Sequence, residues 1–514
     1  MKNKIIYIAL LAAGFTACEP EFEHEVTNSD YSSGDADFTT YVAVGNSLTA
    51  GYMDGTVFRT GQQYSFPNLL AQQFALVGGG AFTQPSYEED VDNLGGISGI
   101  PGFSTRLIIN ASTSSPEPIA GTSTITLTPQ AKAYNNMGVP GAKSFHLLNP
   151  GYGNAANLSL GMANPYFVRT ATSPNATVID DATSLNPTFF TCWIGANDVL
   201  SYATTGGIGV NQEGNINPAT YGGNDITDPN VFAGTYSAII DKLTANGAKG
   251  VVATLPNVTS IPFFTTVPYA PLSPDALGGT ATITQLNTSL YGPMKQVLTL
   301  LGAGDRVNLL SDTAANPVII KDETLTDLSA QLTAAFTLAG YDAATAGFLG
   351  ATYGQARQST SADLILLTTR TVIGANATGV PAPFNVYGVT YPLQDQHVLI
   401  PSEKAAINTA TTHFNTAIRD VAASHNLAVA DMNQILGQLV SGLRVDDGQI
   451  YTADYFSTAS LSTVVFSLDG VHPNARGYAL VANEIIKVIN GYYNAHLPQI
   501  NPGYYPGATI LPTN

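Results

Sequence analysis

Four short apolar runs alternate along the chain with segments of helical spacing. The runs are YVAVG from Tyr41, TFFTCWIG from Thr188, KGVVATLP from Lys249 and LAVADM from Leu427. Each run ends in glycine, proline or polar residues, as is usual for strands that are buried on both faces of a parallel sheet. Strands that alternate with helices are typical of βαβ units. The pattern therefore predicts an α/β fold, with three α/β/α layers around a parallel sheet.

Two segments have the periodicity of long amphipathic helices. The first covers residues 402–424, and Pro401-Ser402-Glu403 supplies a start signal for it. The second begins after HPNARG and precedes the C-terminal tail. Their apolar positions recur at helical spacing: Ile407, Phe414, Ile418 and Val421 in the first, and Tyr478, Val481, Ile485, Ile486 and Ile489 in the second.

Two long segments interrupt this alternation inside a predicted core domain of residues 39–494. Residues 78–130 are rich in Gly, Ser, Thr and Pro, and they contain TSTITLT, which predicts a strand. Residues 262–395 combine an alanine-rich helical pattern, LSAQLTAAFTLAG, with polar turns. We expect both to be insertions or a subdomain laid on the core. Residues 495–514, rich in Pro and Tyr, are expected to pack along the surface.

The N-terminus has the pattern of an export signal. Lys2 and Lys4 precede an apolar run that is too short to span a bilayer, and small residues and Cys18 follow it. This segment resembles a bacterial lipoprotein signal, although Phe15 stands where leucine is usual. The resemblance implies a signal peptide at 1–17, lipid attachment at Cys18 and a location in the cell envelope, on the outer membrane. The acidic and polar residues 18–38 are expected to form a flexible linker.

Composition and charge exclude several classes of partner and cofactor. The chain has 37 acidic against 19 basic residues, a net charge of -18, which argues against nucleic acid and against attraction of the folded body to anionic lipid. Apart from Cys18 the only cysteine is Cys192, in an apolar run where it is expected to be a small buried hydrophobe. Without HExxH or cysteine pairs, no metal or other cofactor is expected.

Four polar segments follow predicted strands or lie near strand ends. They are GNSLTAG from Gly45, NNMGVPGAK from Asn135, WIGAND from Trp193 and LDGVHPNARGY from Leu468. The carboxyl ends of parallel strands meet at one edge of the sheet, where open α/β sheets place their ligand crevices. The four segments are therefore expected to converge on one site.

These four segments together resemble the sequence blocks of the SGNH, or GDSL-type, hydrolase family. The resemblance implies Ser47 as nucleophile, Gly138 and Asn197 as oxyanion-hole residues, and Asp469 and His472 as the remaining members of a triad. One residue departs from the family pattern, because Asn46 occupies the place of the aspartate in Gly-Asp-Ser-Leu. Asparagine keeps the size and hydrogen-bonding capacity but loses the charge.

The chemistry accounts for these residue types independently of the family. A serine hydroxyl needs a base within hydrogen-bond reach, and imidazole, the side chain of His472, is the usual base in this role. Asp469, three residues earlier, is suited to orient that ring. The N–H groups of Ser47 and Gly138 and the side-chain amide of Asn197 are natural donors to a developing oxyanion.

The sequence therefore predicts an ester hydrolase that forms an acyl-enzyme on Ser47. The expected substrate is a small-molecule, lipid or glycan ester, with the membrane reached only through the N-terminal lipid. Two alternatives remain open at this stage: a carbohydrate O-acetyl esterase, and a non-catalytic surface lipoprotein that uses the same scaffold.

Overall fold

The computed structural model describes residues 30–445, 448–457 and 459–511. The predicted signal peptide and Cys18 lie outside the described residues. In the described part of the chain, no helix is both long and apolar enough to cross a membrane.

A five-stranded sheet, parallel throughout, forms the centre of the molecule, in the order β11-β6-β5-β1-β4. The strands are β1 (Tyr41–Gly45), β4 (Asn136–Gly138), β5 (Phe189–Trp193), β6 (Lys249–Ala253) and β11 (Ala428–Ala430). Every residue of β1 and β5 is buried, which explains their uninterrupted apolar sequences. The predicted parallel sheet and four of its strands are confirmed. The fifth strand, β4, was not predicted, because three residues reading Asn-Met-Gly have no strand-like pattern.

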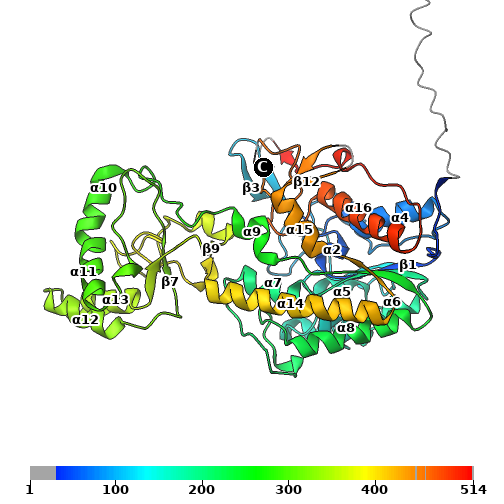
Figure 1. The fold of residues 1–514 in the computed structure, drawn as a ribbon, viewed down its shortest axis with the longest axis horizontal. Coiled ribbons are helices and arrows are strands. Elements are labelled where there is room, and N and C mark those ends of the chain that lie inside the picture. Colours follow the sequence, from blue (N-terminus) through cyan, green and yellow to red (C-terminus); the bar gives the residue numbers. More distant parts are fainter. Residues whose placement is uncertain (1–29, 446–447, 458, 512–514) are drawn as a thin grey trace, which may run out of the picture.

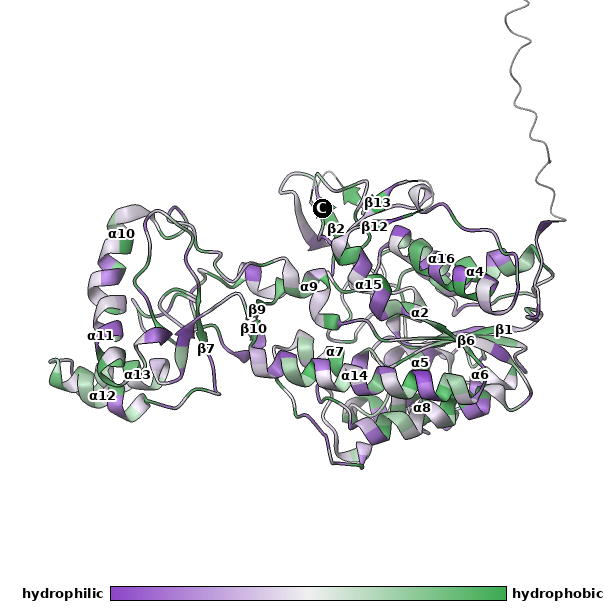
Figure 2. Cartoon of the chain, viewed as in Figure 1, coloured by the Kyte–Doolittle hydropathy of each residue, from purple (hydrophilic) through white to green (hydrophobic). Residues whose placement is uncertain are grey.

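Helices cover both faces of this sheet and give an α/β/α arrangement of layers (Figure 1). On one face lie α4 (Phe66–Ala75) and α16 (Ala475–Tyr492), and on the other α6 (Val178–Ser184), α8 (Pro229–Thr244) and α14 (Pro401–Ser424). The helices alternate hydrophobic and polar residues, while the strands between them are mostly hydrophobic (Figure 2). The two predicted helices are confirmed as α14 and α16. Burial of their apolar faces against the sheet supplies the main driving force for this arrangement.

The second long insertion forms a lobe that projects from the layered body (Figure 1). It has an apolar cluster of its own, in which Tyr291, Ile319, Leu332 and Tyr353 are fully buried. Its elements are α9 (Pro262–Thr265), α10 (Gly279–Leu286), α11 (Gly292–Leu300), β7 (Ile319–Lys321), α12 (Ser329–Leu338), α13 (Ala343–Tyr353), β8 (Ala356–Gln358), β9 (Leu364–Ile365) and η8 (Leu367–Thr371). The strand β10 (Val398–Leu399), just after the predicted end of the insertion, pairs with β9.

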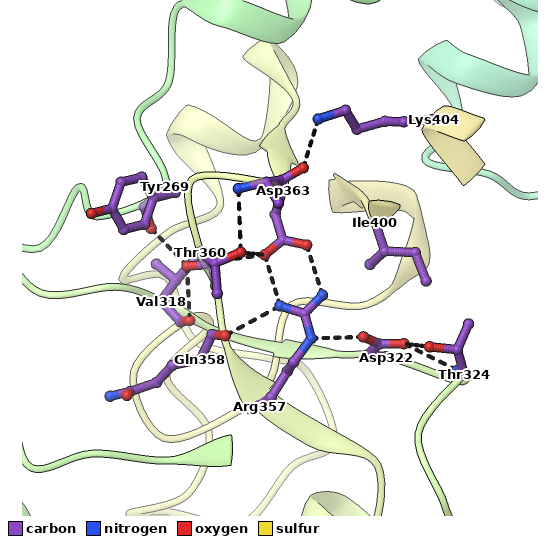
Figure 3. Close-up of polar contacts among 12 residues, drawn as sticks. Tyr269, Val318, Asp322, Thr324, Arg357, Gln358, Thr360, Asp363, Ile400 and Lys404 are labelled. Carbon is purple, nitrogen blue, oxygen red and sulfur yellow. Dashed lines mark hydrogen bonds and ion pairs between the residues drawn. The ribbon is translucent and has the colours of Figure 1, made fainter. Parts of the chain in front are cut away.

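A buried ion network inside the lobe lies next to the first turn of α14 (Figure 3). Arg357 on β8 donates two hydrogen bonds of 2.7 Å to Asp363 and one of 2.6 Å to Asp322. Both carboxylates are almost completely shielded from solvent, with 0% and 6% of their side chains exposed. Lys404 on α14 donates to the backbone oxygen of Ala362, beside Asp363. The network therefore joins β8, the end of β7 and the first turn of α14.

We expect Arg357→Met to destabilise the lobe by about 3–5 kcal/mol, because it leaves two buried carboxylates without their cation. Urea unfolding, with hydrogen exchange at the β7–β8 amides, measures the loss. Lys242→Met is the matched control, since it breaks an exposed pair with Asp180 and should cost less than about 1 kcal/mol. Equal losses in the two variants would contradict the structural role of the network.

The first insertion differs from its prediction. TSTITLT at 122–128 forms no strand; Ile125 is buried, but its backbone oxygen accepts a hydrogen bond from Ser98 in a neighbouring loop. The strands in this region are instead β2 (Leu107–Asn110) and β3 (Ser115–Pro118). The C-terminal tail adds β14 (Ile510–Leu511) in parallel to β2, so it completes a small sheet as well as covering the surface.

The expected flexible linker ends earlier than residue 38. Ser32 pairs with His496, and Asp35 N–H donates to the backbone oxygen of Tyr493. Phe38 is 3% exposed, and its ring stacks on Phe74 at 4.0 Å. The linker prediction is therefore wrong for this part, because backbone hydrogen bonds and the buried Ala36 and Phe38 hold the segment on the folded body.

Candidate active site

Strand register brings three of the four polar segments to the same edge of the sheet. Gly45 at the end of β1 pairs with Gly138 at the end of β4 and with Trp193 at the end of β5. The chain leaves all three strands at the same level, so Ser47 and Asn197 follow from neighbouring strand ends. The predicted convergence of these segments is confirmed.

Ser47 is the first residue of a short helix, α2 (Ser47–Ala50), that begins directly after β1. The Asn46 side chain caps the helix by accepting a hydrogen bond of 3.1 Å from Leu48 N–H. Asparagine thus performs the capping that an aspartate would perform here, and the departure from Gly-Asp-Ser-Leu leaves the turn intact. Gly45 has no room for a side chain, because a Cβ would lie 2.2 Å from Thr49 Oγ1.

His472 and Asp469 reach Ser47 from the far end of the sequence. Nε2 of His472 lies 2.8 Å from Oγ of Ser47, and its Nδ1 lies 2.9 Å from Oδ2 of Asp469. Ser47 is 6% exposed, and the side chains of His472 and Asp469 are 13% and 14% exposed. The three predicted residues therefore form one hydrogen-bonded series, and each of them keeps a small part of its surface exposed to solvent.

Four further donors hold the Asp469 carboxylate. Its Oδ1 accepts from the backbone N–H groups of Val471 and His472 and from Ser467 Oγ, each at 2.9 Å, and its Oδ2 accepts from Gly55 N–H at 3.2 Å. Burial alone would raise the pKa of Asp469, but the charge and hydrogen bonds of His472 outweigh it and hold the pKa below its usual value. Asp469 is therefore an anion at neutral pH and fixes the orientation of the imidazole.

The loop that carries Asp469 and His472 also contacts α9 and η8, two elements of the lobe. Gly470 has φ 72°, and its backbone oxygen accepts a hydrogen bond of 2.9 Å from Phe263 N–H of α9. A Cβ at Gly470 would lie 2.7 Å from Cδ2 of Leu367 in η8. Glycine is required here by both its backbone conformation and this close packing.

The three predicted oxyanion donors differ in whether their hydrogens already have an acceptor in the protein. Ser47 N–H lies in the first turn of α2, where no intrahelical acceptor exists. Asn197 donates one amide hydrogen to the backbone oxygen of Ala142 at 3.0 Å, and a primary amide has a second hydrogen to give. Gly138 N–H donates to Oδ1 of Asn136 at 3.0 Å, so an oxyanion would have to share this donor.

Gly138 also has a packing role that its sequence motif did not reveal. A Cβ there would lie 2.2 Å from Ala50 N, so β4 can lie against α2 only with glycine at this position. Asn136 reinforces the contact by donating to the backbone oxygen of Thr49 at 2.9 Å. The glycine block therefore positions the helix that carries Ser47.

Asp198, the second polar residue of the GxND block, connects the loop after β4 to α7 (Asn197–Thr204). Its carboxylate accepts hydrogen bonds of 2.8 Å from both the N–H and the hydroxyl of Ser144. The residue is fully buried, and burial raises its pKa above the usual value. Asp198 thereby holds Asn197 beside Ala142.

Asp54 is a buried acid that supports the loop carrying Asp469, and sequence reasoning did not identify it. Its N–H donates to Ser467 Oγ at 3.0 Å, and its Oδ1 accepts from Leu468 N–H at 3.0 Å. Burial raises the pKa of Asp54 to about 7. The negative charge of Asp469 also raises this pKa, whereas the hydrogen bond from Leu468 and the positive charge of Arg106 lower it. No sequence motif surrounds Asp54, and only the fold brings it to Ser467.

We expect the stability of the wild type relative to Asp54→Asn to fall as pH rises from about 4 to about 7. The folded protein keeps the Asp54 proton up to about pH 7, whereas an unfolded aspartate releases it near about pH 3.9. The unfolded state therefore binds fewer protons in this window, which favours unfolding by up to about 1.4 kcal/mol per pH unit.

Urea unfolding of both proteins at several pH values measures this difference. Asp275→Asn, which changes an exposed carboxyl in the lobe, is the control and should leave the pH dependence unchanged. Parallel stability curves for wild type and Asp54→Asn would show that Asp54 is ionised throughout.

Cys192 is buried in β5, as expected, and burial raises the pKa of its thiol to about 12. Within residues 30–445, 448–457 and 459–511, no group of three or more His, Cys, Asp or Glu side chains has the arrangement of a metal site.

Comparisons of the chain with protein-family models, with curated proteins and with solved structures give no match.

Proposed function

We propose that this chain is a serine hydrolase of the SGNH type that cleaves carboxylic esters. The observation that supports this most strongly is the series Ser47 Oγ, His472 Nε2, His472 Nδ1 and Asp469 Oδ2, with 2.8 Å and 2.9 Å between successive hydrogen-bonded groups. A hydroxyl in contact with an imidazole that a carboxylate orients is the arrangement that activates serine for attack on a carbonyl.

In the proposed reaction Ser47 Oγ bonds to the ester carbonyl carbon, and His472 Nε2 takes the hydroxyl proton. The carbonyl oxygen becomes an oxyanion, for which the Ser47 N–H and the Asn197 amide are donors. The bond from carbon to the alcohol oxygen then breaks, and His472 passes its proton to the departing alcohol. Water next bonds to the acyl carbon and gives a proton to His472. The bond to Oγ breaks, Ser47 regains its proton, and a carboxylic acid leaves.

The location of this activity is also part of the proposal. With lipid attachment at Cys18, the enzyme would be held in the cell envelope, on the outer membrane, and its substrates would be esters at or near that membrane. Only a short chain separates Cys18 from Ser32, where the described chain first pairs with the folded body. The folded body would therefore remain close to the lipid surface.

Reaction with a fluorophosphonate probe tests the proposed function. The probe should form one adduct, located by peptide mass spectrometry on Ser47, and small aryl esters should be hydrolysed with loss of activity as the adduct forms. Without an adduct and without hydrolysis, a binding protein built on the same scaffold would replace the proposal.

A further inference from the structure

A cavity opens directly beside Ser47 and His472. It has about 890 Å³ of space, including the part open to solvent. Its walls come from α15 (Met432–Ser441), from α16, from α7 and from the loop after β6. Its apolar lining includes Leu200, Val258, Ile435, Leu439, Phe466 and Val481. We refer to it as the α15 pocket.

The α15 pocket has polar side chains almost only at the end where the reacting groups lie. Asn46, Ser47 and His472 stand at that end, and Trp193 contributes the one other side chain with a nitrogen or oxygen atom. No charged carboxylate or ammonium group lines it. The hydroxyls of a sugar or the charge of a phosphate would lose their hydrogen bonds to water there without replacement. The lining suits hydrocarbon.

Two of the three candidate oxyanion donors lie outside this pocket, whereas the third, the N–H of Ser47, belongs to a lining residue. Gly138 and Asn197 are absent from its lining, whereas Gly138 lines a separate small cavity together with Ala50, on the C-terminal side of α2. Ser47 and Ala50, the first and last residues of α2, line one cavity each, so the two cavities adjoin opposite ends of this short helix. An ester carbonyl attacked by Ser47 can therefore direct its oxygen toward Gly138 and Asn197 while an attached chain enters the α15 pocket.

We propose that the α15 pocket binds the hydrocarbon chain of the ester, so that the substrate class is a long-chain, lipid-like ester and not an acetylated glycan. This inference rests on the proposed function of the same site. An acetyl group would leave most of the pocket empty, whereas a long chain buries apolar surface along α15 and α16. The chain can belong to the acid or to the alcohol, and the two are distinguished by experiment.

Two series of substrates test the proposal: aryl esters from acetate to decanoate, and alkyl acetates from ethyl to decyl. Each methylene that enters the pocket should raise kcat/KM by about three- to fourfold until the pocket is filled. A rise in the first series assigns the chain to the acid, and a rise in the second assigns it to the alcohol. No dependence on length in either series, or faster hydrolysis of acetylated xylan than of any long-chain ester, would overturn the proposal.

A pocket variant and a matched control connect this preference to the α15 pocket. Ile435 is a half-buried lining residue, and Ile435→Trp should lower the ratio of kcat/KM for decanoate over acetate by at least about tenfold. Gln434→Trp places the same ring on the exposed side of α15 and should leave the ratio unchanged. Equal ratios in the two variants would contradict the pocket assignment.

Failure of this inference can be separated from failure of the proposed function. A protein that labels with fluorophosphonate but prefers no chain length retains the function and loses the inference. If no ester is hydrolysed, binding of a fluorescent long-chain fatty acid to the wild type decides the matter. Saturable binding that Ile435→Trp weakens and Gln434→Trp does not would support the pocket, and no binding would overturn it.

Discussion

Replacement of Ser47 by alanine is expected to lower kcat for aryl esters by about 10⁴- to 10⁶-fold, with little change in KM. The substitution removes the single Oγ that lies 2.8 Å from Nε2 of His472. Without it no acyl-enzyme forms, and the histidine retains only water to activate. Residual catalysis would come from the oxyanion donors and from binding.

Burst kinetics and fluorophosphonate labelling measure this loss directly. Alanine fits this position, because Ser47 is the first residue of α2 and the helix cap is supplied by the side chain of Asn46. The unfolding temperature of Ser47→Ala should therefore stay close to that of the wild type. Ser441→Ala, an exposed serine at the end of α15, is the control for the chemical change alone. A Ser47→Ala protein that retains more than about a hundredth of wild-type kcat would remove Ser47 from the proposed mechanism.

Much of the sheet and of the candidate site was predictable from local sequence. Buried parallel strands have to be continuously apolar, and β1 and β5 show that pattern without interruption. The polar residues that follow strand ends meet at one edge, so a serine after β1 and an asparagine after β5 were expected to be neighbours. No strand of the central sheet directly precedes His472, so its contact with Ser47 does not follow from this rule.

Features that depend on tertiary packing alone were not predictable. The strand β4 is too short for any periodicity, and only its pairing with β1 defines it. Asp54 lies near the beginning of the chain, yet it supports Ser467 through a hydrogen bond that no local pattern indicates. The α15 pocket likewise combines residues from five distant segments. Sequence pattern identifies which side chains are apolar, but not which of them leave space between them.

Contact between the lobe and the site is a further property that only the three-dimensional structure reveals. The lobe begins at α9 and η8 lies later in it, and both elements touch Gly470 between Asp469 and His472. α9 and η8 also contact each other, and Phe263, Phe264 and Leu367 pack in the apolar core of the layered body. The long insertion is thus packed against the loop that supplies the acid and the base.

Replacement of Asp469 by asparagine is expected to lower kcat for aryl esters by about 10⁴-fold while the fold is preserved. Asparagine can still accept hydrogen bonds from Val471 N–H and His472 N–H through its oxygen. Its NH₂ group would then face Nδ1 of His472, which would favour the tautomer with the proton on Nε2. An imidazole protonated at Nε2 cannot accept the proton of Ser47, so the nucleophile would no longer be activated.

Steady-state kinetics and the rate of fluorophosphonate labelling should fall together in Asp469→Asn, because both require an activated Ser47. Asp454→Asn, which changes an exposed carboxyl close in sequence, is the matched control and should stay within about twofold of the wild type. The unfolding midpoint in urea separates lost catalysis from lost folding. A variant that folds and keeps kcat within tenfold of the wild type would show that His472 needs no anionic partner, and the triad would then reduce to Ser47 and His472.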